Sequence, residues 1–255
     1  MTTAIHVVNK RTDAFDLYIG RGSVWGNPYR LPQHHTDADR ARVIEQYERY
    51  LLRSPKLMAR LPELYGKRLG CFCAPRPCHG DVLKRYAEAW AQGVAVYSHV
   101  VLITGSRTWE DEPAMRRAFN DLWREWTPGQ VTSPMLLFGA CPDGADAMGE
   151  RLWRAAGFTT MPFPADWPTH GKAAGFRRNQ VMVEIATRLR DAHARVACTA
   201  FLDLCSKPGC RRRDDQQLMP KVPGHFSHGT IDCRERAIEA GLDVVDVIQP
   251  PLSQA

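Results

Sequence analysis

Strict alternation of short apolar runs with amphipathic segments, from residue 100 onward, constrains the fold more than any other feature of the sequence. Apolar runs predict five strands, at residues 100–105, 135–139, 159–162, 194–202 and 242–247. Four segments with helical periodicity lie between these runs. Such alternation is typical of βαβ units. We therefore expect an α/β fold, a Rossmann-like parallel sheet of about five strands with helices on both faces.

The part of the chain before residue 96 lacks this alternation. A helical stripe of apolar residues begins at Val43, a strand is expected at residues 67–73, and a helix at residues 81–90. This pattern predicts a small α+β domain. A chain of 255 residues is long enough for two domains. We place the boundary in the stretch AQGVAVYSH, which gives a small domain at 1–95 and the Rossmann-like domain at 96–255.

Glycine and polar residues gather at four places where a predicted strand ends or a helix begins. They are TGSRTW at 104–109, GACPDGAD at 139–146, AGFRRN at 174–179 and SHGTIDC at 227–233. In open α/β sheets, ligands bind beyond the carboxyl ends of the strands, where helix N-termini supply free N–H groups. One such stretch would indicate only a tight turn, but four at equivalent places predict a ligand site.

The residues of these stretches suggest how an anionic ligand would be held. Backbone N–H groups at 105–106 could approach a phosphate beside a charged arginine, and Asp146 could accept a hydrogen bond from a ribose hydroxyl. Arg178 would lie over the phosphate or ribose, and the 229–230 turn would form a second phosphate cradle. The candidate ligand-binding residues are Gly105, Ser106, Arg107, Gly139, Gly144, Asp146, Asn179, Gly229 and Thr230.

The ordered series GSR, GxxxGAD, PADW, AGxxRN and GT followed by an acid resembles the YspA-like branch of the SLOG superfamily. This Rossmann-like group contains the lonely-guy phosphoribohydrolases and the DNA-processing protein DprA. The resemblance covers about residues 99–248 and implies a nucleotide or nucleotide-derived ligand. By position in the motif, Arg178 and Asp232 match the arginine and the acid that lonely-guy enzymes use to cleave an N-glycosidic bond. Here HG replaces the usual two glycines, and the acid is the shorter aspartate.

Three functions remain open at this stage. The first is hydrolysis of a nucleotide N-glycosidic bond, with an acid acting on an oxocarbenium-like transition state. The second is a non-catalytic sensor or sequestering protein for a nucleotide signal such as an ADP-ribose derivative. The third is DNA binding of the DprA kind, which a net charge of +6 supports only weakly. The sequence leaves homo-oligomer formation open.

Two motifs of the first domain suggest a second site. The stretches YIGRGSVWGNPYR (18–30) and CFCAPRPCH (71–79) together resemble a small domain of unknown function common in phage and bacterial genomes, over about residues 4–92. We expect the two motifs to meet in one cleft. Three roles are open for the cysteines of the second motif: a zinc site, a reactive Cys78 at a helix N-terminus, or small buried thiols. The second-site candidates are Arg21, Ser23, Trp25, Asn27, Cys78 and His79.

A further group of cysteine and histidine residues brackets an insertion of about twenty residues before the GT helix. Pairs at this spacing can close a loop around zinc. The candidate metal ligands are Cys205, Cys210, His225 and His228. Zinc would be a structural ion here, and no cofactor is required by the pattern. The basic run at 211–213 is followed at once by two aspartates, and we expect a solvated loop there.

The sequence also bears on the cellular compartment. Its N-terminus, MTTAIHVVNKRTD, lacks the apolar core of a signal peptide, and no later stretch reaches the roughly 18 apolar residues of a membrane span. We expect a cytoplasmic protein that does not bind membranes. Its eight cysteines would then be reduced thiols, available for metal or for chemistry.

Overall fold

The computed structural model describes residues 4–127, 129–208, 210 and 225–248. The chain divides into two compact units, residues 1–96 and residues 97–255. Before the division, helix α3 (His79–Gln92) ends at Gly93, whose left-handed φ of 64° is the usual helix stop. The basic run at 211–213 and the aspartates after it lie outside the described residues.

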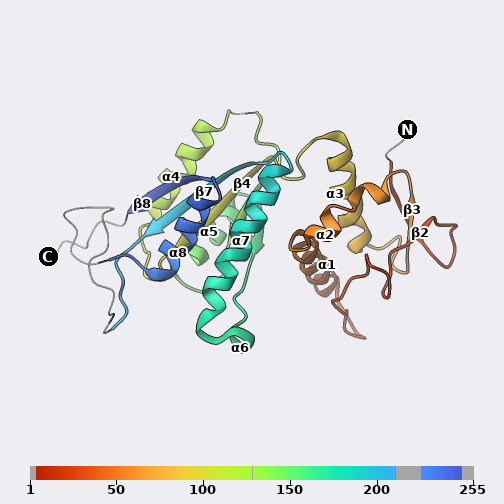
Figure 1. The fold of residues 1–255 in the computed structure, drawn as a ribbon, viewed down its shortest axis with the longest axis horizontal. Coiled ribbons are helices and arrows are strands. Elements are labelled where there is room, and N and C mark those ends of the chain that lie inside the picture. The colour runs from red at the N-terminus through yellow and green to blue at the C-terminus, as the bar shows by residue number, and fades with distance from the viewer. Residues whose placement is uncertain (1–3, 128, 209, 211–224, 249–255) are drawn as a thin grey trace. The chain divides into compact units, whose positions relative to one another are not determined.

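A five-stranded parallel sheet forms the centre of the second unit (Figure 1). Its strands are β4 (His99–Gly105), β5 (Pro134–Phe138), β6 (Thr159–Pro162), β7 (Arg195–Leu202) and β8 (Asp243–Ile248). Their order across the sheet is β6-β5-β4-β7-β8. The chain thus winds outward from β4 in one direction and then, from β7, in the other. The expected Rossmann-like α/β fold is confirmed, and the order of the strands reverses between β4 and β7.

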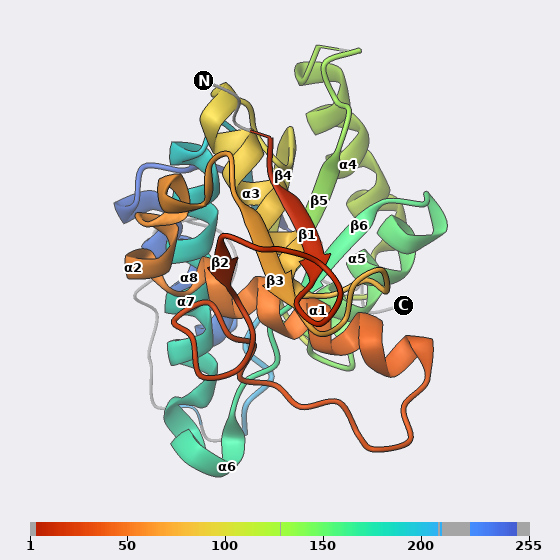
Figure 2. The same ribbon diagram turned by 90° about the vertical axis from the view of Figure 1, so that its right-hand side faces the viewer.

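Helices cover both faces of this sheet. They are α4 (Glu112–Glu125), α5 (Gly144–Ala155), α6 (Trp167–His170), η2 (Gly171–Ala173), α7 (Ala174–Asp191) and α8 (His228–Glu239). Alternate strand residues such as Val101, Ile103 and Phe138 pack with α4 and α5 in one core, because successive side chains of a strand point to opposite faces. Figure 2 shows α4 and α5 on one side of the sheet and α7 and α8 on the other.

The first unit contains a three-stranded parallel sheet in the order β1-β3-β2. Its strands are β1 (His6–Asn9), β2 (Leu17–Tyr18) and β3 (Arg68–Cys71), and its helices are α1 (Asp37–Leu52), α2 (Pro55–Met58), η1 (Leu61–Leu64) and α3. Of the three strands, the sequence predicted only β3. None of the described helices in either unit combines the length and apolar composition that a membrane span requires.

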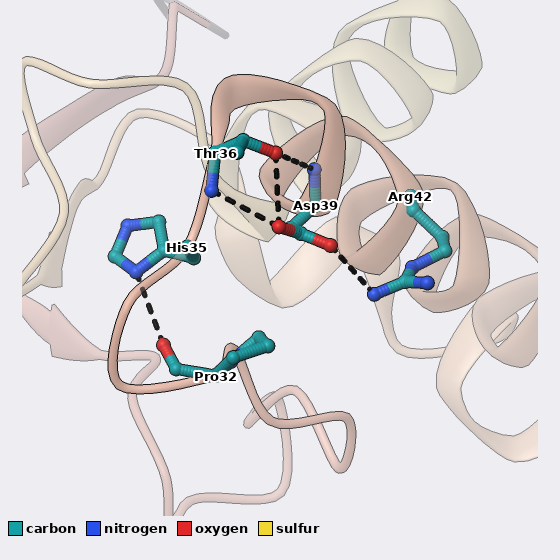
Figure 3. A network of polar contacts seen from close by, with 5 residues as sticks. All are labelled: Pro32, His35, Thr36, Asp39 and Arg42. Atoms are coloured by element: carbon teal, nitrogen blue, oxygen red, sulfur yellow. Dashed lines mark hydrogen bonds and ion pairs between the residues drawn. The ribbon is translucent and has the colours of Figure 1, made fainter.

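Helix α1 begins where a capping box satisfies its first N–H groups (Figure 3). The Thr36 hydroxyl accepts from the Asp39 N–H at 3.1 Å, and the Asp39 carboxylate accepts from the Thr36 N–H at 3.0 Å. The Thr36 N–H and the Thr36 hydroxyl both donate to the Asp39 carboxylate and lower its pKa. The same carboxylate accepts from Arg42 at 2.8 Å. Reciprocal caps of this kind set the first residue of a helix.

Candidate functional site

A cavity of about 320 Å³ opens at the carboxyl ends of β4, β5 and β7 in the second unit. Its walls come from the residues that follow these strands and from the first turns of α7 and α8. This is where the strand order reverses, the position at which open α/β sheets bind ligands. The structure brings most of the predicted ligand residues into the lining: Gly105, Ser106, Arg107, Gly139, Asp146, Arg178, Asn179, Gly229 and Thr230.

Arg178 lies on the second turn of α7 and reaches back over the end of β5. Its side chain is 15% exposed. Gly139 makes room for it, because a Cβ at that position would lie 1.3 Å from the Arg178 Nη1. The Nε and Nη1 atoms are buried and have no hydrogen-bond partner within the described part of the chain. Leaving buried donors of a charged group unpaired is costly, so this guanidinium is able to take an anionic partner.

Asp146 supplies a carboxylate next to Arg178. Its Oδ2 lies 3.6 Å from the Arg178 Nη1 and accepts a hydrogen bond from the Cys141 N–H at 3.1 Å. Burial raises the pKa of Asp146 above its ordinary value, while the guanidinium and the Cys141 N–H oppose that rise. The carboxyl group is therefore both close to the cavity and easier to protonate than an exposed aspartate. Its contact with a ribose hydroxyl stays a prediction.

The first turn of α8 forms another part of the cavity wall. Ser227, the N-cap residue, makes no side-chain capping bond, so its hydroxyl does not satisfy the N–H groups that every helix leaves free at its start. A Cβ added at Gly229 would meet nothing within 4 Å, which shows open space beside the turn. The Thr230 Oγ1 is buried without a hydrogen-bond partner in the described chain. Such a helix start suits an anion.

The turn after β4 is used partly for packing. The Ser106 N–H donates to the Phe201 carbonyl oxygen at 3.2 Å, so it is already engaged within the sheet. Gly144, with a φ of 67°, lies outside the cavity lining, and a Cβ there would lie 2.2 Å from the Ser106 carbonyl oxygen. This glycine lets α5 start against the end of β4. In the turn after β4, the exposed side chain of Arg107 is a group that can reach an anion.

Asn179 and Asp232 contact each other instead of both facing the cavity. The Asn179 Nδ2 donates to the Gly229 carbonyl oxygen at 2.9 Å and to the Asp232 Oδ2 at 3.0 Å. Arg236 Nε donates to both Asp232 oxygens at 3.1 Å. Asp232 does not line the cavity, because it lies two residues beyond Thr230 and therefore about 200° around the helix. The motif match implied a role for Asp232 at the reacting bond; in the structure Asp232 lies on α8 outside the cavity lining, and that role stays a prediction.

Several residues that the sequence reasoning missed complete the cavity wall. Trp167 and Phe176 line the cavity and keep 49% and 43% of their surface exposed. Lys172 and Lys207 are also exposed in the lining. With Arg107 and Arg178 they give four cations against one carboxylate, that of Asp146, among the described residues of the lining. The tryptophan lies in the quoted PADW motif, which was the available signal.

The four predicted zinc ligands come together beside the same cavity. Their ligand atoms all lie within 4.8 Å of one another. Cys205 and His228 belong to both the cluster and the cavity lining.

A second cavity, of about 310 Å³, lies within the first unit and is bordered by both of its motifs. Arg21 and Asn27 reach it from the first motif, and Cys78 and His79 from the second. Ser23 and Trp25 do not line it. The Ser23 hydroxyl donates to the Gly20 carbonyl oxygen within a turn at 2.8 Å. Trp25 is a core residue, only 1% exposed, and its carbonyl oxygen accepts from the Tyr47 hydroxyl at 2.7 Å.

Three thiols form one wall of this second cavity. The sulfur atoms of Cys71, Cys73 and Cys78 lie within 4.8 Å of one another. Hydrogen bonds from the other two thiols, together with Arg40, lower the pKa of Cys73. The pKa of Cys78 is raised by its two neighbouring thiols and by burial, although its sulfur accepts from the Gly80 N–H at the start of α3. The geometry thus favours a thiolate at Cys73 over one at Cys78.

His79 is turned away from the three thiols. Its Nε2 lies 2.8 Å from the Ile19 carbonyl oxygen, and its side chain is buried. Burial lowers the pKa of His79, so the imidazole is neutral and donates this hydrogen bond. The second motif therefore brings three sulfur atoms together without the adjacent histidine.

Comparison with known proteins assigns both units. Residues 5–89 match the family described as "Domain of unknown function (DUF4326)", and residues 99–170 match the "YspA, cpYpsA-related SLOG family". An "Uncharacterized 12.4 kDa protein in nrdA-td intergenic region" of Enterobacteria phage T4 is 42% identical over 81 residues, which are 30% of this chain and 71% of that protein. The "Gene 61 protein" of Mycobacterium phage D29 is 31% identical over 156 residues, which are 59% of this chain and 98% of that protein. The chain belongs to both families.

The SLOG match covers only part of the cavity. It includes the turns after β4 and β5 and the PADW motif, and it ends before α7 and α8. Membership in the SLOG family supports a nucleotide-related ligand for this unit. Arg178, Asn179, Gly229 and Thr230 lie outside the matched range, and it is the fold that brings them to the same cavity.

Proposed function

We propose that the SLOG unit binds a nucleotide or a nucleotide-derived anion in the cavity at the ends of β4 and β7. The observation that carries this proposal is the half-buried Arg178 side chain, which lines the cavity and whose Nε and Nη1 atoms have no hydrogen-bond partner within the described chain. Three further cations and the open first turn of α8 surround the same space. An anionic ligand is the group that such an arrangement stabilises.

The cavity offers different surroundings to the parts of a nucleotide. A phosphate fits the side of Arg178 and the first turn of α8, where N–H groups and positive charge converge. A base fits the side of Trp167 and Phe176, because exposed aromatic faces stack on bases of any sequence. The ribose would then lie between them.

Thermal unfolding with a panel of AMP, GMP, CMP, UMP and ADP-ribose tests the proposal. A ligand at about 100 times its Kd should stabilise the SLOG unit by about 2.7 kcal/mol. Arg178→Ala should lose this stabilisation, whereas Arg177→Ala, the exposed neighbour on the same helix, should keep it. An Arg178→Met, Asp146→Asn double variant removes the ion pair as a unit and controls for unfolding caused by an unpaired carboxylate. A parent chain that none of these ligands stabilises would contradict the proposal.

Hydrolysis of the N-glycosidic bond is the second candidate function. It is favoured by one observation: a carboxyl group of raised pKa, Asp146, lies in the cavity wall and could protonate a leaving base. Asp232, the acid suggested by the motif, has its oxygens engaged by Asn179 and Arg236. We therefore assign protonation of the leaving base to Asp146, and the motif-derived role of Asp232 at the oxocarbenium-like transition state stays a prediction.

Release of free base from the same nucleotide panel separates catalysis from binding. If hydrolysis occurs, Asp146→Asn should lose about a hundredfold or more in rate, and Asp232→Asn should lose much less. The reverse order would return the role to Asp232. Nucleotide binding without base release by the parent would leave the sensor or sequestering function as the better description.

A further inference from the structure

The cluster of Cys205, Cys210, His225 and His228 has the dimensions of a metal site. The Cys210 Sγ lies 3.2 Å from the Nε2 atoms of both His225 and His228, and these two nitrogens are 3.0 Å apart. The Cys205 Sγ lies 3.9 Å from the His228 Nε2. For a tetrahedral ion with Zn–S and Zn–N bonds of ordinary length, ligand atoms are separated by about 3.3–3.8 Å. The observed separations of 3.0–3.9 Å differ from these values by at most about 0.4 Å, and all four ligand atoms lie within 4.8 Å of one another.

Backbone contacts hold the two ends of the insertion together independently of any ion. The Cys205 N–H donates to the His225 carbonyl oxygen at 2.7 Å, and the Ser227 N–H donates to the Asp203 carbonyl oxygen at 3.0 Å. Leu204 and Phe226 form an antiparallel bridge between these donors. The Cys210 N–H donates to the Lys207 carbonyl oxygen at 3.3 Å, which closes a turn and returns Cys210 toward Cys205. The ligands are therefore preorganised by the fold.

We propose that these four residues hold one zinc ion in a closed, four-coordinate structural site. Two thiolates and two imidazoles are a ligand set that suits zinc, and four protein ligands leave no position for a substrate. On binding, each of the two thiols loses its proton and the imidazoles bind as neutral groups, so zinc uptake releases two protons to the solvent. All four side chains are half-buried, which leaves the ion a path into the site.

The zinc would fix the wall of the ligand cavity. His228 is the first residue of α8, and Gly229 and Thr230 follow it directly. Cys205 follows β7 and also lines the cavity. A zinc ion bonded to both would tie the end of β7 to the first turn of α8. The metal site itself does not depend on the proposed nucleotide function, because its ligands and its test are independent of any nucleotide.

Metal analysis of the purified chain tests the site directly. The three thiols of the DUF4326 unit could also hold metal, so the decisive quantity is the difference between variants. Cys205→Ser with Cys210→Ser should contain one equivalent of zinc less than the parent. Cys141→Ser, which changes another half-buried cysteine of the same cavity, should keep the parent's content. Equal zinc in the parent and the double variant, after both are incubated with zinc and desalted, would overturn the site.

Two further measurements keep the test decisive if the double variant folds poorly. Cobalt added to the metal-free parent should give the strong visible absorption of a tetrahedral site with thiolate charge transfer. His225→Ala should lose the part of this absorption that comes from the Cys205, Cys210, His225 and His228 site, and His225→Cys should recover it, because sulfur can replace the imidazole as a ligand. A parent that gives only the weak spectrum of octahedral cobalt would overturn the proposal even if every variant unfolds.

Hydrogen exchange tests whether zinc ties the end of β7 to the first turn of α8. Hydrogen exchange of the amides at 203–205 and 225–233 should quicken when a chelator strips the zinc, and should slow again on reloading. The amides of β4 should exchange at the same rate throughout. If zinc binds but the exchange rates of these amides do not change, then zinc does not fix the first turn of α8, although the metal site itself is still supported.

Discussion

Replacing Gly139 with alanine gives the sharpest test of how the cavity holds Arg178. The new Cβ would lie 1.3 Å from Nη1, 2.2 Å from Cζ and 2.8 Å from Nη2 of that side chain. Overlap with three atoms of a rigid, planar group is too large for a shift of a few tenths of an ångström to relieve. The guanidinium must leave its place, although the variant keeps the arginine and its charge.

The expected loss of affinity follows from the hydrogen bonds that the guanidinium can make. Hydrogen bonds to charged groups contribute about 1.5–3 kcal/mol each. Loss of two such bonds to an anion costs at least about 3 kcal/mol, which is about a hundredfold in Kd. The stability of the SLOG unit should fall by about 1–3 kcal/mol, the cost of a buried group that loses one partner, because Asp146 loses its cation but keeps the Cys141 N–H.

The change in Kd can be measured by calorimetric titration of the parent, of Gly139→Ala and of a control variant with the nucleotide of the panel that binds best. Gly175→Ala is the matched control, since its added Cβ would lie in the same cavity wall and would meet only the Trp167 ring, at 3.7 Å. That variant should bind as the parent does. If Gly139→Ala binds the nucleotide with the parent's affinity, then Arg178 does not contact the ligand from the position described.

Other variants test the supports of both sites. Asn179→Ala should destabilise the SLOG unit by about 1–3 kcal/mol in chemical unfolding, because the buried Asn179 amide loses its hydrogen bonds to the Gly229 carbonyl oxygen and to Asp232. An unchanged midpoint would show that these two hydrogen bonds do not stabilise the unit. Burial lowers the pKa of His79 below 6.5, so the stability it supports is complete above pH 6.5 and is lost as the pH falls from there to the folded pKa. His79→Gln should flatten that pH dependence, and an equally steep loss in the variant would point to another group. Iodoacetamide at neutral pH should modify Cys73 before Cys71 and Cys78, and Arg40→Met should slow the modification of Cys73. If Cys71 or Cys78 is modified first, Cys73 is not the thiolate.

The sheet of the SLOG unit could be predicted because buried parallel strands are continuous apolar runs, as Val100 to Ile103 illustrates. The place of the cavity also followed from topology, since ligands collect at the carboxyl ends of such strands. The DUF4326 sheet could not be predicted in the same way. Its strands span only two to four residues, and β2 (Leu17–Tyr18) carries no periodic pattern at all.

A short motif gives the order of residues along the chain but not the direction of their side chains. Asp232 follows the GT pair in the sequence, but helical phase turns it toward Asn179. Trp25 belongs to a motif that borders a cavity, and yet its ring fills the core. Conversely, the PADW motif gave no role for Trp167. The exposure of this ring in the cavity lining depends on the short α6 helix (Trp167–His170), which the sequence did not predict. Side-chain direction and exposure are properties of packing, and a short motif does not contain them.

The exposed ring of Trp167 leads to a last prediction, on what distinguishes a nucleotide from a bare sugar phosphate. Stacking on an aromatic side chain contributes about 1–3 kcal/mol per base. Trp167→Ala should therefore weaken AMP binding by about 5- to 150-fold and leave ribose 5-phosphate binding unchanged. Trp90→Ala removes a ring of similar exposure, 44%, from the DUF4326 unit and should change neither affinity. The ring also lies 6.0 Å from the Arg107 guanidinium, so an equal loss for both ligands would show that it positions the phosphate-binding arginine and not the base.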